Sequence, residues 1–129
     1  MSHAMRSFAG ASLLSLALVA YGSSAVAAEG WSVSHGTADA SGTTRSVETG
    51  GLFGNVAVEG ELRNTGSGCY TLWIQWTADL TVGPPFKMGT QCGPGSVPVR
   101  FEKPGGLGTT WVKICRDTQH TDCSPIQYL

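Results

Sequence analysis

The segment from Cys69 to Leu80 alternates apolar and polar residues with a period of two along its whole length. One set of alternate residues is Tyr70, Leu72, Ile74, Trp76, Ala78 and Leu80. The other set is Cys69, Thr71, Trp73, Gln75, Thr77 and Asp79. Alternate side chains of a β-strand point to opposite faces, and this spacing makes no coherent helical stripe. The pattern therefore predicts a strand whose first, wholly apolar set faces a core.

Shorter stretches of the same alternation recur along the chain. They predict strands at Trp31–His35, Val56–Arg63, Val97–Glu102, Thr109–Arg116 and around Ile126–Leu129, with a short segment at Phe86–Gln91. The polar, turn-rich stretch Gly36–Gly51 is expected to be a long loop or an irregular edge. Pro98 places its strand at a sheet edge or beside a bulge, because proline donates no ladder hydrogen bond. We expect an all-β fold, a small antiparallel β-sandwich or barrel of about six to seven strands.

The N-terminal residues have the order of a secretory signal peptide. Arg6 precedes the apolar run 11–20, and the small residues Ala25-Val26-Ala27-Ala28 follow. The apolar run is too short to span a hydrocarbon core of about 30 Å. We expect residues 1–28 to be removed, with cleavage after Ala28 or equally after Ala27. Removing 28 of the 129 residues leaves 101, enough for a single secreted β domain at 29–129.

The charge of that predicted domain argues against two classes of partner. Seven basic and nine acidic residues remain, so the net charge is about −2 with neutral histidines. Binding to phosphate backbones or anionic lipid depends on clustered Lys and Arg. We expect no nucleic acid partner, no membrane contact in the mature form, no cofactor, and a monomer.

Four cysteines lie beyond the predicted signal peptide, at Cys69, Cys92, Cys115 and Cys123. In an oxidising compartment an even number of cysteines predicts disulfides. Of the three possible pairings we favour Cys69–Cys92 with Cys115–Cys123, because the second pair closes a short polar loop at the end of a strand. Zinc binding is the alternative, but the spacing contains no short Cys-Cys pair.

Few residues suggest catalysis. Asp117, His120 and Asp122 lie within six residues and could bind a metal or form a general base, or could simply be a solvated loop. Glu59 and Glu61 share a strand face with Arg63, which fits a solvated charge ladder better than glycoside hydrolysis. No motif for an activated nucleophile is present. We therefore expect a protein that is not an enzyme and has no catalytic residue or metal site.

Two tryptophans are the most suggestive residues for binding. Trp73 and Trp111 fall on the faces opposite to the predicted core residues, and could form a platform for sugar rings or a patch for a protein partner. The alternatives are that a second sheet covers them or that each shields a disulfide.

Constrained loops are the other candidates for ligand contact. We expect contact points at Lys103–Gly108, Arg116–Asp122 and Gln91–Ser96, because disulfides lower the cost of ordering such loops on binding. Arg116 is the expected anchor. The predicted function is surface recognition of an extracellular protein, with carbohydrate or cell-wall binding through Trp73 and Trp111 as the alternative.

Several segments resemble small secreted actinobacterial proteins of unassigned function. They are Gly60-Glu61-Leu62, Gly68-Cys69-Tyr70, Cys92-Gly93-Pro94-Gly95-Ser96 and Trp111-Val112-Lys113-Ile114-Cys115-Arg116-Asp117. The resemblance implies export, disulfides and a β fold, and it implies no catalytic residues. A fainter likeness is to the secreted two-disulfide amylase-inhibitor sandwiches. This chain lacks both their cysteine upstream of Cys69 and their Trp-Arg-Tyr triplet.

Overall fold

The computed structural model describes residues 29–129, which contain nine β-strands and no helix. The strands are β1 (Glu29–His35), β2 (Ala38–Val47), β3 (Asn55–Asn64), β4 (Cys69–Ala78), β5 (Thr81–Val82), β6 (Phe86–Cys92), β7 (Gly95–Pro104), β8 (Thr110–Arg116) and β9 (Gln127–Tyr128). The predicted signal peptide, residues 1–28, lies outside the described residues. No helix long and apolar enough to cross a membrane occurs between residues 29 and 129.

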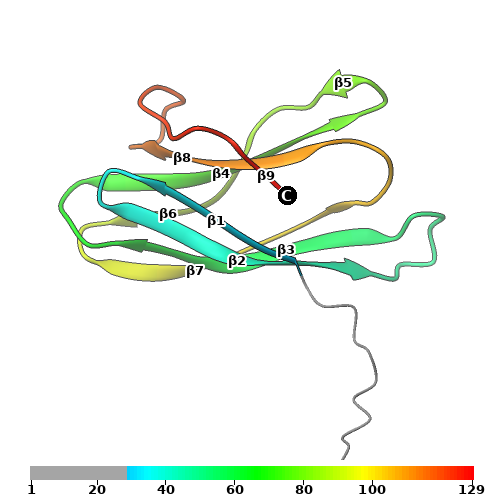
Figure 1. The fold of residues 1–129 in the computed structure, drawn as a ribbon, viewed down its shortest axis with the longest axis horizontal. Coiled ribbons are helices and arrows are strands. Elements are labelled where there is room, and N and C mark those ends of the chain that lie inside the picture. Colours follow the sequence, from blue (N-terminus) through cyan, green and yellow to red (C-terminus); the bar gives the residue numbers. More distant parts are fainter. Residues whose placement is uncertain (1–28) are drawn as a thin grey trace, which may run out of the picture.

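The strands form two antiparallel sheets that pack face to face (Figure 1). The first sheet has the order β1-β2-β3-β7. The second has the order β5-β4-β8-β9, and β6 pairs with β4 along the same edge as β5. The two sheets do not close into a barrel, so the all-β sandwich prediction is confirmed, although with nine strands instead of six or seven.

The core lies between the two sheets and uses the residues that the alternation selects. Leu72 and Ile74 of β4 and Val112 and Ile114 of β8 are fully buried. Across the interface they meet apolar side chains of the first sheet, including Trp31, Ala40, Val58, Leu62 and Val99. Burying large aliphatic side chains such as these is the dominant favourable contribution to folding.

The prediction for Gly36–Gly51 is wrong, because most of this stretch is strand β2. Its inner face carries Ala38 and Ala40, which are almost fully buried, and then Gly42. Gly42 is paired with Gly60 of β3, and a Cβ atom on either glycine would collide with the backbone of the opposite strand. Small side chains let the strands approach closely, and they hide the apolar alternation by which a strand is recognised in a sequence.

The long predicted strand ends earlier than its sequence pattern suggests. β4 stops at Ala78, and Asp79 and Leu80 turn the chain with φ angles of 50° and 63°. Leu80 was predicted to face the core, but it is fully exposed. Pro98, in contrast, lies on β7, an edge strand of the first sheet, as predicted.

Both favoured disulfides are present. Cys69 of β4 is bonded to Cys92, its register partner on β6, and Cys115 of β8 is bonded to Cys123 in the loop that follows. The described residues contain no free cysteine, so no thiolate is left for a zinc site.

The two ends of the sandwich differ (Figure 1). The disulfide end holds tight, hydrogen-bonded turns at residues 36–37, 65–68 and 93–94 and the 117–126 loop. The loop end holds the longer connections at residues 48–54, 79–85 and 105–109. Both disulfides lie at the other end, so neither constrains the loop end. There, two of the connections are joined by a hydrogen bond from the amide of Gly105 to the Gly54 carbonyl oxygen at 2.9 Å.

Candidate functional site

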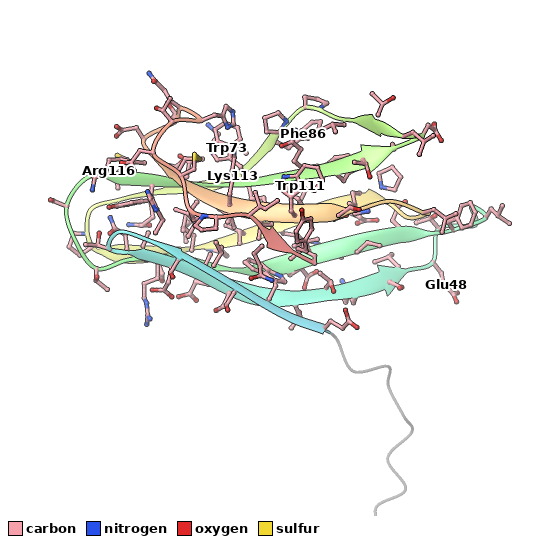
Figure 2. All side chains as sticks on the ribbon, turned by 45° about the horizontal axis from the view of Figure 1, so that its top comes forward. Glu48, Trp73, Phe86, Trp111, Lys113 and Arg116 are labelled. Atoms are coloured by element: carbon pink, nitrogen blue, oxygen red, sulfur yellow. A yellow bond between two sulfur atoms is a disulfide. The ribbon has the colours of Figure 1, made fainter. Side chains whose placement is uncertain are left out.

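The outer face of the second sheet gathers aromatic and basic side chains. We call Trp73, Lys87, Trp111, Lys113 and Tyr128 the aromatic face. In the register of the sheet, Trp73 lies between Lys87 of β6 and Lys113 of β8, and Trp111 is paired with Tyr128 of β9. Figure 2 shows Trp73, Lys113 and Trp111 projecting from this sheet away from the other layer. The expected opposite orientation of the tryptophans and the core residues is therefore correct, and the other sheet does not cover them.

Each tryptophan is half-buried against an aromatic neighbour. The ring of His120 lies over Trp73, with the ring centroids 4.1 Å apart and a tilt of 51°. Trp111 meets Tyr128 edge to face at 6.3 Å, and 58% of Tyr128 is exposed. The indole nitrogen of Trp73 is buried and forms no hydrogen bond with the described residues. Trp73 thus supports the 117–122 loop, whereas Trp111 and Tyr128 present the more open part of the face.

The outer face of the first sheet carries charged side chains that pair with one another. On the first sheet, a single carboxylate oxygen of Glu59 pairs with Arg45 at 3.0 Å and with Arg100 at 3.3 Å. Arg63 pairs with Asp39 at 3.3 Å. Glu59 and Arg63 of the predicted charge ladder therefore pair with residues of neighbouring strands, whereas Glu61 forms no ion pair with the described residues, and such solvent-accessible pairs contribute little to stability.

The two lysines of the aromatic face differ from the arginines in their ion pairing. All four arginines of residues 29–129 lie within ion-pair distance of a carboxylate, but neither Lys87 nor Lys113 does in this part of the chain. Two uncompensated cations therefore flank Trp73, one on each side. An uncompensated positive charge on a protein surface attracts an acidic partner.

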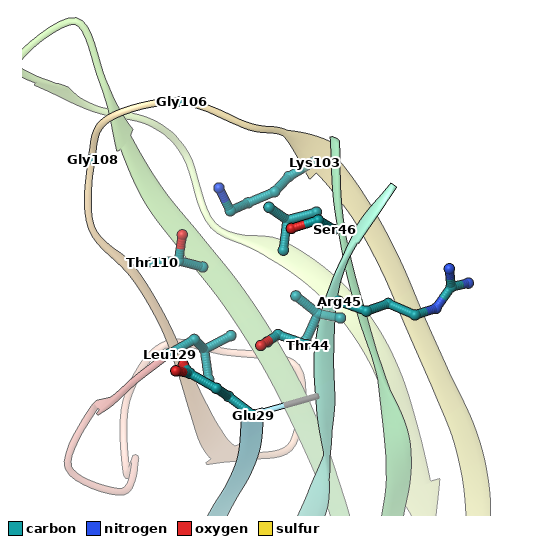
Figure 3. Close-up of a pocket in the computed structure, with 11 residues that line it drawn as sticks. Glu29, Thr44, Arg45, Ser46, Lys103, Gly106, Gly108, Thr110 and Leu129 are labelled. Atoms are coloured by element: carbon teal, nitrogen blue, oxygen red, sulfur yellow. The ribbon is translucent and has the colours of Figure 1, made fainter. Parts of the chain in front are cut away.

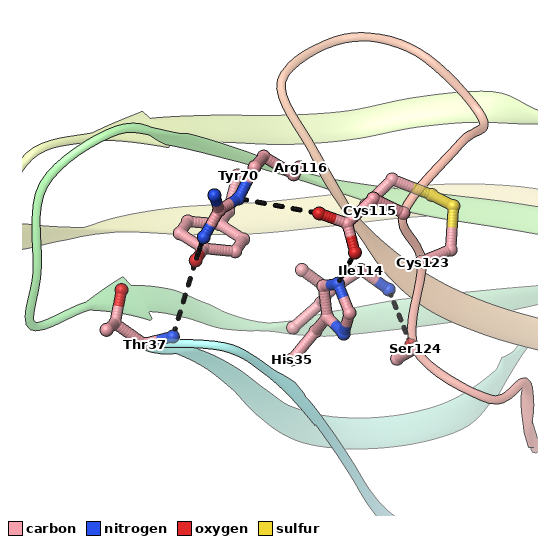
Figure 4. Close-up of polar contacts among 9 residues, drawn as sticks. His35, Thr37, Tyr70, Ile114, Cys115, Arg116, Cys123 and Ser124 are labelled. Carbon is pink, nitrogen blue, oxygen red and sulfur yellow. Dashed lines mark hydrogen bonds and ion pairs between the residues drawn. A yellow bond between two sulfur atoms is a disulfide. The ribbon is translucent and has the colours of Figure 1, made fainter.

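Arg116, the expected anchor, belongs to a polar cluster at the disulfide end (Figure 4). Its guanidinium donates to the Tyr70 hydroxyl at 2.9 Å and lies 5.5 Å from the centre of that ring. Its Nε atom is 3.6 Å from a carboxylate oxygen of Asp122, and the other oxygen of Asp122 accepts from His35 at 3.0 Å. The hydrogen bond from Arg116 is the main cause that lowers the pKa of Tyr70 and raises that of Arg116. Although its side chain is 57% exposed, Arg116 is therefore held by partners within the protein.

The acidic residues around His120 do not converge on a shared centre. Asp122 faces His35 and Arg116, whereas the tilted ring of His120 packs on Trp73. Between residues 29 and 129, no three His, Cys, Asp or Glu side chains are placed to hold a metal ion. The geometry gives this cluster a structural use in positioning the 117–122 loop.

A pocket that the sequence pattern does not predict lies between the inner faces of the sheets at the loop end (Figure 3). Its volume is about 590 Å³. It is lined by Glu29, Thr44, Arg45, Ser46, Val56, Val58, Lys103, Gly106, Gly108, Thr110 and Leu129. The only signal in the sequence was Lys103, a basic residue that continues the inward set Val97, Val99 and Phe101.

The loop end also exposes several large apolar side chains. Leu52, Leu80 and Leu107, one on each long connection, are 91%, 105% and 95% exposed. Phe86 is 40% exposed at this end but stacks on Trp76, with ring centroids 5.1 Å apart. The three leucines make no comparable packing contact, so they contribute little to the core.

These features define a class of protein, a disulfide-bonded antiparallel β-sandwich with a lysine-flanked aromatic face. Comparison of the chain with protein-family models, with curated proteins and with solved structures finds no match. The resemblance to small actinobacterial secreted proteins and to amylase inhibitors therefore stays a prediction.

Proposed function

We propose that this protein is a non-enzymatic, secreted binding domain that recognises an acidic surface of another protein through its aromatic face. The observation that carries the proposal is the position of Trp73 and Trp111 on adjacent strands, beside two lysines without carboxylate partners. Tryptophan and tyrosine dominate the binding energy of protein interfaces, and complementary charge guides association. The two disulfides fit an oxidising, extracellular environment.

The 117–122 loop adds to this face. His120 places the loop over Trp73, and the Cys115–Cys123 disulfide closes its base. A constrained loop loses less conformational entropy on binding than a free one. The predicted contact at Arg116–Asp122 therefore adjoins the aromatic face, with Arg116 contributing the guanidinium donors that Tyr70 leaves unused.

The decisive experiment compares variants of the two outer faces. An extracellular partner captured by the intact protein would be titrated against Trp111→Ala, Lys113→Glu and the control Arg63→Ala. We expect Trp111→Ala to weaken binding about tenfold to hundredfold, as interface aromatic residues do. Lys113→Glu should slow association and make the affinity less dependent on salt. Equal affinities for all four proteins would refute a role for the aromatic face.

Glycan binding is the second candidate, because Trp73 and Trp111 are diagonal neighbours across two paired strands. A sugar ring needs an open indole face, and His120 covers part of Trp73. Recognition of a protein is therefore the better supported of the two functions. Titration with chitin, cellulose and peptidoglycan fragments, followed by tryptophan fluorescence, separates the two. A saturable change that Trp111→Ala abolishes and that salt does not affect would favour the glycan.

A further inference from the structure

The pocket at the loop end has the size of a small-molecule site. Its volume of about 590 Å³ falls within the range of about 300–1,000 Å³ that is usual for ligand pockets. It lies between the inner faces of the two sheets, whereas the aromatic face lies on the opposite, outer face of the second sheet. A ligand in this pocket would therefore bind at a different face of the protein from the partner proposed above.

Lys103 supplies the one cationic amine that reaches into this pocket. Figure 3 shows its side chain extending from β7 toward the loop that carries Gly106 and Gly108. Its Nζ atom donates to the neighbouring Pro104 carbonyl oxygen at 3.2 Å, and no carboxylate of residues 29–129 lies within ion-pair distance of it. An ammonium group has three donors, so two remain for a ligand.

Partial burial of this amine favours pairing with an anion. Partial desolvation lowers the pKa of Lys103, which means that the charged form is under-solvated where it stands. A charge held in a partly desolvated site interacts more strongly with an opposite charge than one in water does. Glu29 also lines the pocket, but Figure 3 shows its side chain near Leu129, away from Lys103.

The remaining lining residues suit a ligand with two different ends. Thr44, Ser46 and Thr110 bring hydroxyl groups to the walls, and their side chains form no hydrogen bonds within the described part of the chain. Apolar surface comes from Val56 and Leu129, while Val58 is fully buried behind the wall. Leu107, between the two lining glycines, is 95% exposed and adds an apolar side chain beside the pocket.

We propose that the pocket binds a small single-chain amphiphile with an anionic head group. The head group pairs with the Lys103 ammonium, and the alkyl chain lies against the valine and leucine side chains of the wall. Decanoate is the probe that combines these two features. Acetate shares only its head group, and decanol shares only its chain.

The test is a calorimetric titration of the disulfide-intact protein with the three probes, accompanied by NMR amide shifts. We expect saturable decanoate binding with shifts confined to the lining residues, and at least about tenfold weaker binding of acetate and of decanol. Lys103→Met, which keeps the length of the side chain without its charge, should weaken decanoate binding about tenfold or more while leaving decanol unaffected. The matched control is Arg63→Met, which removes an exposed cation from the outer face of the first sheet and should change neither affinity.

A second variant keeps the proposal testable if Lys103→Met disturbs the fold. Val56→Phe enlarges a side chain in the wall and should reduce the binding of decanoate and decanol alike. Decanoate binding that shifts amides elsewhere, or that survives both substitutions undiminished, would overturn the proposal. The absence of any saturable shift with decanoate would do the same.

Discussion

Tyr70 and Arg116 are register partners on β4 and β8, and the Arg116 guanidinium donates a hydrogen bond to the Tyr70 hydroxyl at 2.9 Å. The same hydroxyl accepts a longer bond of 3.4 Å from the amide of Thr37, in the turn between β1 and β2 of the other sheet. A Cβ atom on Gly36 would collide with this hydroxyl, and Gly36 has a φ angle of 57°. One buried phenol therefore joins the two layers at the disulfide end.

The first prediction concerns Tyr70→Phe, which removes the hydroxyl but keeps the ring. Arg116 and the Thr37 amide then lose an acceptor, so the melting temperature should fall. Arg116→Lys is the companion variant, because a lysine cannot reproduce the planar guanidinium over the ring and should lower the melting temperature too. Differential scanning calorimetry checks both. An unchanged melting temperature in Tyr70→Phe would show that the hydroxyl does not join the layers.

The pH dependence of stability is the second prediction. The Arg116 hydrogen bond holds the pKa of Tyr70 below its ordinary value of 10.0, so the folded protein releases this proton at a lower pH than the unfolded chain. Between that lowered pKa and pH 10 the unfolded chain binds more protons, and the free energy of unfolding should rise with pH. Tyr70→Phe should flatten the rise.

The contribution of Lys103 to the pH dependence of stability must be separated from that of Tyr70. Burial lowers its pKa as well, so its contribution has the same sign up to pH 10.5. Urea unfolding at several alkaline pH values, on the intact protein, Tyr70→Phe and Lys103→Met, separates the two groups. Tyrosinate absorbance in the intact protein and in Tyr70→Phe gives the titration of Tyr70 directly. A Tyr70 titration at or above pH 10 would contradict the expected shift.

The sequence was most informative where one side of a strand is apolar and large. Leu72 and Ile74 were assigned correctly to the core, because the alternate residues of their strand are all apolar. Strand β2 was missed because its buried residues are small, so packing against Gly60, which is distant in sequence, decides its structure. Leu80 was misplaced because a turn with positive φ at two non-glycine residues has no clear local signal.

The candidate site was predictable only in part. The outward direction of Trp73 and Trp111 follows from the strand period, but the contact of the His120 ring with Trp73 depends on where a disulfide-closed loop folds. The pocket around Lys103 depends on the separation of two sheets at one end, which no local pattern encodes. Tertiary contacts between distant segments are the common cause of both omissions.

The two disulfides lead to the third prediction. Cys69–Cys92 joins residues 23 apart, and Cys115–Cys123 joins residues 8 apart. Chain-entropy estimates predict that the free energy of unfolding falls by about 3.5 kcal/mol in Cys69→Ala/Cys92→Ala and by about 2.5 kcal/mol in Cys115→Ala/Cys123→Ala. Urea unfolding measures both. The variant Cys115→Ala/Cys123→Ala should also release His120 from Trp73 and alter tryptophan fluorescence. A fluorescence spectrum identical to that of the intact protein would argue against a link between this disulfide and the position of His120.

The close approach of β2 and β3 leads to the fourth prediction. Gly42→Ala places a Cβ atom against the Glu59 carbonyl oxygen and the Gly60 Cα atom, so the strands must separate. The free energy of unfolding should fall by about 1–3 kcal/mol, as overpacking in a core does. Gly30→Ala is the matched control, because its nearest neighbour would be 3.8 Å away, and it should change stability by less than about 0.5 kcal/mol. Equal stability of the two variants would mean that the strands tolerate a side chain at Gly42.

The last prediction contrasts two leucines that share one alternating segment of sequence. Leu72 is fully buried, so Leu72→Ala should lower the free energy of unfolding by about 2–5 kcal/mol through lost burial and the cavity it leaves. Leu80 is fully exposed in the turn after β4, so Leu80→Ala should change that free energy by less than about 0.5 kcal/mol. Urea unfolding of the two variants under identical conditions compares them directly. A loss at Leu80 comparable to that at Leu72 would place Leu80 in the core, and the strand would then continue past Ala78 as the sequence pattern alone suggests.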